Sequence, residues 1–340
     1  REGERLKFCP ESPCFWDKRF LCRRAVACRT ENQKSQGIRF CNGKVMTMSD
    51  LSPVKEVQIR RFAHQIRLET LRELVGLGFG HVGGCMSICE LLAVLYSGQL
   101  HASPAEKDDP NRDRLICSKG HAGPAVYAAL ALRGFMPLEM LSTLNKPGTR
   151  LPSHCDRNLT PGIDMTTGSL GQGLSVGVGA ALGCRLDGRE SSLYVIVGDG
   201  EAQEGQIWEA AMAASQFRLS NLIVFIDHNG YQINGPISQI NDISNFAQRF
   251  ESFGWNTIEV DGHDVRQLHE AISEAKRSEE KPTAIIMRTV IGYGCKYALE
   301  SARCHSLNMP ADKLAESIAL VEEEIARCDE ILREGAEENA

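Results

Sequence analysis

The feature that most restricts the fold is a regular alternation of short apolar segments with polar turns and stretches of helical spacing. Continuous apolar runs lie at 193–197 and 222–226, and further runs follow at 255–260 and 283–287. Residues with helical spacing separate these runs, and parallel strands need such crossover connections. The alternation therefore predicts an α/β fold, a doubly wound, mostly parallel sheet with helices on both faces.

Polar turns follow several of the expected strands. The strand expected at 114–117 continues into SKGH at 118–121, the run at 193–197 into GDG, and the run at 222–226 into DHN. The carboxyl ends of parallel strands share one edge of a sheet, and open α/β sheets bind ligands at that edge. A Gly-rich loop between two expected helices adds His81. These turns therefore predict one ligand site.

Charge and cysteine are unevenly distributed along the 340 residues, and they suggest three parts. Residues 1–45 hold 11 Lys/Arg against 5 Asp/Glu and five of the 13 cysteines, whereas the remaining residues hold 27 basic against 39 acidic side chains. We expect 1–45 to be a basic, Cys-rich segment that is disordered or non-native, and 46–310 to be the α/β domain. Residues 311–340 should form an amphipathic helix with an acidic tail. The acidic main part argues against nucleic acid as a partner.

Cysteine usage indicates a reducing compartment. The early cysteines form no C-x-x-C pair, which disfavours a zinc site, and the later ones lie mostly in apolar stretches, where a thiol packs as a small core side chain. No apolar run has the length of a signal-peptide core or a membrane span. We expect a cytoplasmic protein with no membrane partner.

Asp199 and Asn229 form the strongest local pattern, because each follows an expected strand within a polar turn. Carboxylate and amide oxygens are ligands that Mg²⁺ or Ca²⁺ prefers, and the neighbouring glycines let backbone N–H groups approach a diphosphate. Taken alone, the pair fits equally well with two unrelated turns. A nicotinamide site is disfavoured, since no G-x-G-x-x-G opens a helix directly after an expected strand.

In this context, GDG followed about thirty residues later by Asn resembles the thiamine diphosphate motif. Three longer runs, NRDRLICSKGHA at 111–122, TTGSLGQG at 166–173 and GDGEAQEG at 198–205, follow in the order and spacing of transketolases. From about residue 60 to 310 the chain resembles the diphosphate-binding half of that family, and in particular the N-terminal subunits of two-chain transketolases. The resemblance implies the thiamine diphosphate-binding fold, with a domain of the PP type at 46–310.

The resemblance also implies a set of site residues. The side chains of Asp199 and Asn229 and the backbone carbonyl of Tyr231 would bind Mg²⁺, with Ca²⁺ or Mn²⁺ as substitutes. Imidazoles titrate near neutrality and can exchange protons with sugar oxygens, which suits the family's histidines. The implied catalytic residues are His81, His121, His154 and His305. The implied cofactor-binding residues are His121, Gly168, Ser169, Leu170, Gly198, Asp199, Gly200, Glu204, Asn229 and His305.

The activity that the resemblance implies is transfer of a two-carbon ketol unit from a ketose phosphate to an aldose phosphate, as in the pentose phosphate pathway. Only thirty residues follow residue 310, whereas the family's second half carries the glutamate that activates the cofactor. We therefore expect a separate C-terminal subunit with the pyrimidine-binding and C-terminal domains, in a heterotetramer. Two alternatives stay open: a subunit of another thiamine diphosphate enzyme (2-oxo acid dehydrogenase or deoxyxylulose-type synthase), or a non-enzymatic cofactor-binding paralogue.

Overall fold

The computed structural model describes residues 40–41, 44–45, 51–301 and 304–337. The chain divides into two units, Arg1–Met48 and Ser49–Ala340. In the first unit, strands β1 (Phe40–Cys41) and β2 (Lys44–Val45) form a short antiparallel pair. The rest of the expected basic, Cys-rich segment lies outside the described residues.

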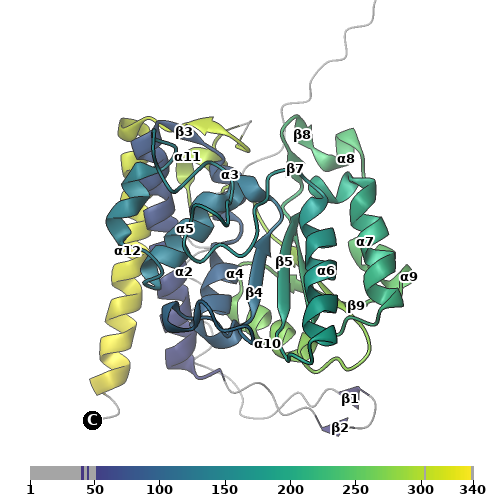
Figure 1. The fold of residues 1–340 in the computed structure, drawn as a ribbon. Helices are drawn as coiled ribbons and strands as arrows, with labels where there is room; N and C mark the ends of the chain where they lie inside the picture. Colours follow the sequence, from purple (N-terminus) through teal and green to yellow (C-terminus); the bar gives the residue numbers. More distant parts are fainter. Residues whose placement is uncertain (1–39, 42–43, 46–50, 302–303, 338–340) are drawn as a thin grey trace, which may run out of the picture. The chain divides into compact units, whose positions relative to one another are not determined.

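A five-stranded sheet forms the centre of the second unit (Figure 1). Its strand order is β4-β5-β6-β10-β9, and each neighbouring pair is parallel. The predicted fold class, a parallel α/β sheet flanked by helices, is confirmed. The strands are β4 (Arg114–Cys117), β5 (Leu193–Gly198), β6 (Leu222–His228), β9 (Asn256–Asp261) and β10 (Thr283–Arg288).

Alternate residues of the strands belong to two separate cores. In β5, Tyr194 and Ile196 belong to one core, and Val195 and Val197 belong to the other. All of β5 is buried, as a strand covered on both faces should be. The first core includes residues of α2 (Pro53–Leu77), α4 (Cys89–Val94), α5 (Gly123–Leu132) and α10 (Val265–Ala275), and the second those of α6 (Gln172–Leu186), α7 (Gly205–Gln216) and α9 (Phe246–Ser252).

The ends of α2 follow from its flanking residues. The apolar period predicts a helix from about residue 59, but α2 begins at Pro53 because Ser52 Oγ accepts a hydrogen bond from Lys55 N and proline fits the first turn. The helix ends at Gly78, whose φ of 88° is left-handed and favours glycine. His81 follows three residues later, directly before α3 (Val82–Met86).

Helix α12 (Ala311–Glu337) lies alongside α2 (Figure 1). Leu314 and Val321 are buried on the inner face of α12, one heptad apart. Arg61 of α2 donates to Asp329 of α12 at 2.6 Å. The amphipathic pattern at the end of the sequence therefore packs against the α/β domain rather than standing free.

Contrary to the expectation from the sequence, one segment of the described chain, Val82–Gln99, is long and apolar enough to cross a membrane. It comprises α3, α4 and a π-helical turn at Leu95–Gln99, and 89% of it is buried inside the protein, as in a core helix.

The remaining short elements include β3 (Phe79–Gly80) paired with β11 (Leu307–Asn308), β7 (Tyr231–Gln232) paired with β8 (Gly235–Pro236), α8 (Ile237–Ile240) and α11 (Lys296–Leu299).

Candidate active site

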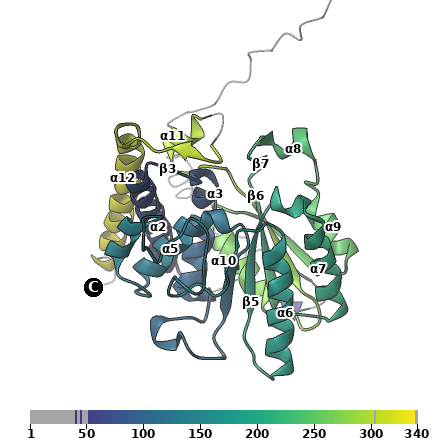
Figure 2. The same cartoon turned by 45° about the horizontal axis from the view of Figure 1, so that its top comes forward.

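A cavity of about 610 Å³ opens at the carboxyl edge of the sheet, the edge that Figure 2 brings forward. Its walls come from the loop before α3, the turns after β4, β5 and β6, and the loops around residues 154, 168 and 305. Ser169 does not line the cavity, although both of its neighbours do. The predicted site residues that line it are His81, His121, His154, Gly168, Leu170, Gly198, Asp199, Gly200, Glu204, Asn229, Tyr231 and His305.

Asp199 lies directly beyond β5, where the strand register pairs Gly198 with Asp227. Its buried carboxylate accepts hydrogen bonds from the backbone N–H groups of Gly200 (2.7 Å) and Gly230 (2.6 Å). Burial, and then the neighbouring Asp227 carboxylate, raise the pKa of Asp199 to about 7. No cationic side chain of the described residues forms an ion pair with Asp199. A bound cation would supply the missing positive charge.

Asn229 lies on the turn after β6, and Tyr231 begins β7. The hydrogen bond from Gly230 N to Asp199 holds this turn against Asp199. Asn229 Oδ1 accepts from Tyr231 N at 3.1 Å. A carboxylate, an amide oxygen and a backbone carbonyl are hard donors typical of Mg²⁺. No group of three or more His, Cys, Asp or Glu side chains suited to a metal occurs in the described parts of the chain, so a cation here needs the amide, the carbonyl and diphosphate oxygens. In donor chemistry and in charge, these residues fit the predicted cation site.

Four histidine rings meet in the cavity. The centroid of the His81 ring lies 5.3 Å from that of His121, 6.0 Å from His154 and 5.6 Å from His305. Burial lowers the pKa of His81, lowers that of His121 to about 2 and lowers that of His305 to about 4. These three rings are therefore neutral at pH 7, and each offers one N–H donor and one acceptor nitrogen. Such a cluster can hold hydroxyl groups and exchange protons with their oxygens.

Glu201 joins three of the loops that form the cavity. Its buried carboxylate accepts hydrogen bonds from Ser118 Oγ (2.5 Å), Gly171 N (2.9 Å) and Gly198 N (3.0 Å). Burial raises the pKa of Glu201 above its usual value. Ser118 follows β4, Gly171 precedes α6 and Gly198 ends β5. This one side chain therefore fixes the three segments relative to one another.

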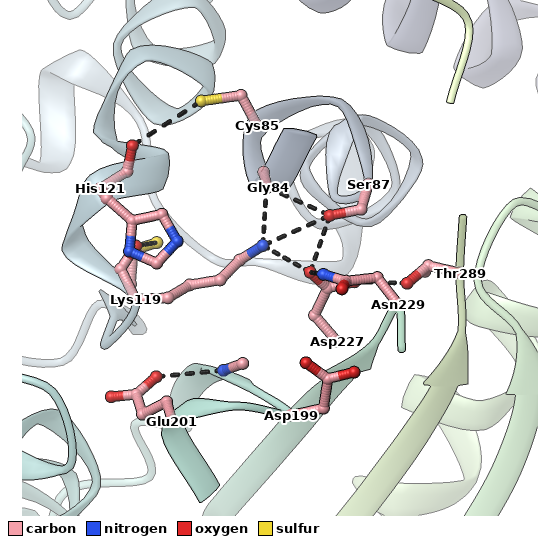
Figure 3. A network of polar contacts seen from close by, with 12 residues as sticks. Gly84, Cys85, Ser87, Lys119, His121, Asp199, Glu201, Asp227, Asn229 and Thr289 are labelled. Atoms are coloured by element: carbon pink, nitrogen blue, oxygen red, sulfur yellow. Dashed lines mark hydrogen bonds and ion pairs between the residues drawn. The ribbon is translucent and has the colours of Figure 1, made fainter. Parts of the chain in front are cut away.

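A second buried network centres on Lys119 and Asp227 (Figure 3). Lys119 Nζ donates to the Gly84 carbonyl and to Asp227 Oδ2, each at 2.6 Å. Asp227 also accepts from Ser87 Oγ (2.7 Å) and Thr289 Oγ1 (2.5 Å). Burial would lower the pKa of Lys119, but Asp227 raises it above its usual value. Burial would likewise raise the pKa of Asp227, but Lys119 lowers it, so both groups are charged.

Two glycines allow the loops behind the cavity to approach closely. Gly168 has a left-handed φ of 138°, and a Cβ there would lie 3.1 Å from His154 Cδ2. A Cβ on Gly120 would lie 2.8 Å from the Gly168 nitrogen. Between them, Thr167 Oγ1 donates to the Cys117 carbonyl at 2.7 Å. These contacts place the predicted cofactor residue Gly168 beside a catalytic candidate.

The sequence alone indicates no role for Lys119, Glu201 or Asp227, although each lies within a motif that points to the site. Their signal is an ionisable residue at or just beyond the end of an apolar strand, where burial forces it to find a partner. Gln203, within the motif at 198–205, also lines the cavity. Three further polar residues line it outside any motif: Gln232, Asn234 and Asn241.

Residues 59–320 match the family model described as "Transketolase, thiamine diphosphate binding domain". The chain is 46% identical over 270 residues to the 6-deoxy-6-sulfo-D-fructose transketolase subunit SqwG of Clostridium sp. (strain MSTE9), covering 79% of this chain and 98% of that one. It is 35% identical over 250 residues to an apulose-4-phosphate transketolase subunit of Phocaeicola vulgatus, covering 74% of this chain and 89% of that one.

Solved transketolases share the fold. The structure from Pichia stipitis in complex with sedoheptulose-7-phosphate superposes with a TM-score of 0.71 at 29% identity, covering 83% of this chain and 46% of that one. The structure from Campylobacter jejuni gives a TM-score of 0.70 at 26% identity, covering 80% of this chain and 48% of that one. The chain thus spans about half the length of these structures. On the family match and these likenesses, the chain belongs to the transketolase family.

Proposed function

We propose that the chain is the N-terminal, cofactor-binding subunit of a transketolase. It takes part in the transfer of a two-carbon ketol unit from a ketose or ketose phosphate to an aldose phosphate, with thiamine diphosphate and Mg²⁺. One observation carries this proposal: the oxygen donors of Asp199, Asn229 and Tyr231 line the same cavity as the four histidines.

The residues that line the cavity divide into two groups with different tasks. Asp199, Asn229 and the Tyr231 carbonyl hold Mg²⁺, and Gly200 lets the backbone approach the diphosphate. His121 contacts the diphosphate as a neutral donor. When bound, thiamine diphosphate supplies the carbon nucleophile for the donor carbonyl.

The remaining histidines act on the sugar. His81 and His305 are neutral at pH 7, so each ring can donate to a substrate oxygen or accept a hydroxyl proton. With His154 they would act on the substrate oxygens that gain alkoxide character when the carbon–carbon bond breaks or forms. Positioned imidazoles typically contribute about 10²- to 10⁴-fold to such proton transfers.

The proposed partner is a separate C-terminal subunit in a cytoplasmic heterotetramer. Two relatives named as subunits match this chain over 98% and 89% of their own lengths. The longer solved transketolases match it over less than half of theirs. The partner would supply the pyrimidine-binding domain and the carboxylate that activates the cofactor.

The test combines the chain with a C-terminal transketolase subunit from the same organism, thiamine diphosphate and Mg²⁺, and follows ketol transfer to an aldose phosphate by mass spectrometry. The donors include fructose 6-phosphate, sedoheptulose 7-phosphate, 6-deoxy-6-sulfo-D-fructose and apulose 4-phosphate. We expect transfer by the pair, none by either chain alone, and none when Asp199→Ala replaces the wild type. A pair that binds the cofactor but transfers from no ketose would refute the proposal, and turnover of a 2-oxo acid would favour the alternative enzyme class.

A further inference from the structure

We propose that Asp227 is a positioning residue that orients the side-chain amide of Asn229, so that the amide oxygen faces the bound cation. Asp227 itself is fully buried and does not line the cavity. The inference rests on the proposed Mg²⁺ and thiamine diphosphate site and assigns a role to a residue outside it.

The hydrogen bonds around Asn229 define one orientation of its amide. Asn229 Nδ2 donates to Asp227 Oδ2 at 2.9 Å. On its other side, Asn229 Oδ1 and Asp199 Oδ2 accept from the consecutive backbone N–H groups of Tyr231 and Gly230. The amide oxygen and the Asp199 carboxylate are therefore bound by adjacent peptide N–H groups of one segment, whereas the NH₂ group is bound by Asp227.

An amide needs such a partner because its two ends have nearly the same shape. If the side-chain amide of Asn229 were rotated by about 180°, its NH₂ group would face the cation, and an NH₂ group cannot act as a ligand. Asp227 prevents this rotation, because its Oδ2 already accepts hydrogen bonds from Lys119 Nζ (2.6 Å) and Ser87 Oγ (2.7 Å). Toward Asn229 this oxygen can therefore act only as an acceptor, which selects the NH₂ end of the amide.

The position of Asp227 is itself fixed from several elements. Ser87, from the segment between α3 and α4, and Lys119, after β4, both donate to Oδ2. Thr289, directly after β10, donates to Oδ1 (Figure 3). Figure 3 shows these donors surrounding the carboxylate together with Asn229. A ligand that lies on a turn is thereby tied to the rigid end of the sheet, and partners of this kind typically contribute about 10- to 100-fold in metal affinity.

A double-mutant cycle tests the proposal. The full chain at saturating thiamine diphosphate is titrated with Mg²⁺ by calorimetry, and circular dichroism monitors its folding. We expect Asp227→Asn to weaken Mg²⁺ binding at least 10-fold, because an amide at 227 tolerates either orientation of Asn229. In the Asn229→Ala background there is no amide left to orient, so the same substitution should change the remaining affinity less than threefold. Thr289→Val is the matched control: it removes a donor to Oδ1, the oxygen that does not contact Asn229, and should leave the affinity within twofold.

The outcomes separate this proposal from the function that it rests on. Asp199→Ala must abolish the cation dependence of cofactor binding; if it does not, or if the wild-type chain binds no Mg²⁺ with the cofactor, the cation site and the positioning role both fail. If Asp199→Ala acts as expected but folded Asp227→Asn binds Mg²⁺ within twofold of wild type, the positioning role alone is refuted. Equal losses in the two backgrounds, or a loss in Thr289→Val as large as in Asp227→Asn, would also refute it, because the effect would then be general damage to the network.

Discussion

Replacing Asp199 with asparagine should make the chain more stable at pH 8 when Mg²⁺ and cofactor are removed, although it destroys the cation site. The carboxylate is 1% exposed and has no ion-pair partner among the described residues, and burial raises its pKa to about 7 from an ordinary value of 3.8. The folded protein therefore holds this proton more tightly than the unfolded chain does. The protonated carboxyl group therefore contributes its full stability below pH 3.8. This contribution to the free energy of unfolding falls as the pH rises from 3.8 to about 7, and it changes no further above pH 7.

The size of the effect follows from the two pKa values. A difference of about three units corresponds to about 4 kcal/mol of destabilisation by the ionised carboxylate. Asparagine avoids this loss because it carries no charge. Its NH₂ group, however, would face one of the two backbone N–H groups, of Gly200 or Gly230, that donate to Asp199 in the wild type. Leaving one buried donor unsatisfied costs about 1–3 kcal/mol. The net expectation at pH 8 is a gain of about 2 kcal/mol, and at pH 5 there should be no gain or a small loss.

Urea denaturation in EDTA at pH 5, 6, 7 and 8 measures this directly for the wild type and for Asp199→Asn. The free energy of unfolding of the wild type minus that of the variant should fall as the pH rises. When the two free energies are plotted against pH, the curves should cross between pH 5 and pH 8. A wild-type chain more stable than the variant at pH 8, or a difference that does not change with pH, would refute the electrostatic reasoning. Mg²⁺ with thiamine diphosphate should stabilise the wild type but not the variant.

Three other substitutions test separate parts of the site and the fold. His121→Ala should weaken thiamine diphosphate binding, measured by calorimetry on the chain, because a neutral donor to the diphosphate is lost. His154→Ala should leave that affinity within about threefold and lower kcat of the assembled enzyme by about 10²-fold or more; equal effects of both variants on affinity would contradict the division of roles. Gly173→Ala should lower the melting temperature by several degrees, because its Cβ would lie 2.3 Å from Ser118 Oγ and overpacking costs about 1–3 kcal/mol. Gly179→Ala is the control in the same helix, since its Cβ meets nothing within 4 Å and alanine favours helix, and a loss there as large would show that the clash is not the cause.

The periodic parts of the fold could be read from the sequence because burial on both faces leaves a direct pattern in the residues. The run expected at 114–117 has the bounds of β4, and the run at 283–287 is extended by one residue in β10. Helix α2 begins six residues before its apolar period does, because its start depends on a capping side chain and a proline rather than on hydrophobic spacing.

The candidate site was predictable in part for a related reason. Side chains that must face a ligand stand in motifs at strand ends, so the donors Asp199 and Asn229 could be named from their positions. Asp227 could not be given a role, since nothing in its own motif says that Lys119, more than a hundred positions earlier, will be its partner. Contacts of that separation are fixed by strand order, and strand order is a property of the whole fold.

The cavity is assembled from segments that extend from His81 to His305, and this spacing gives the bound cofactor a second consequence. Opening of any one segment breaks the site, so each opening must also release the ligand. A ligand at 100 times its Kd adds about 2.7 kcal/mol to the free energy of such openings, wherever along the chain they occur. Saturation with Mg²⁺ and thiamine diphosphate should therefore slow amide hydrogen exchange in the distant loops around residues 81, 154 and 305 by a common factor, which makes the cofactor a cross-link between parts of the chain that no covalent bond joins.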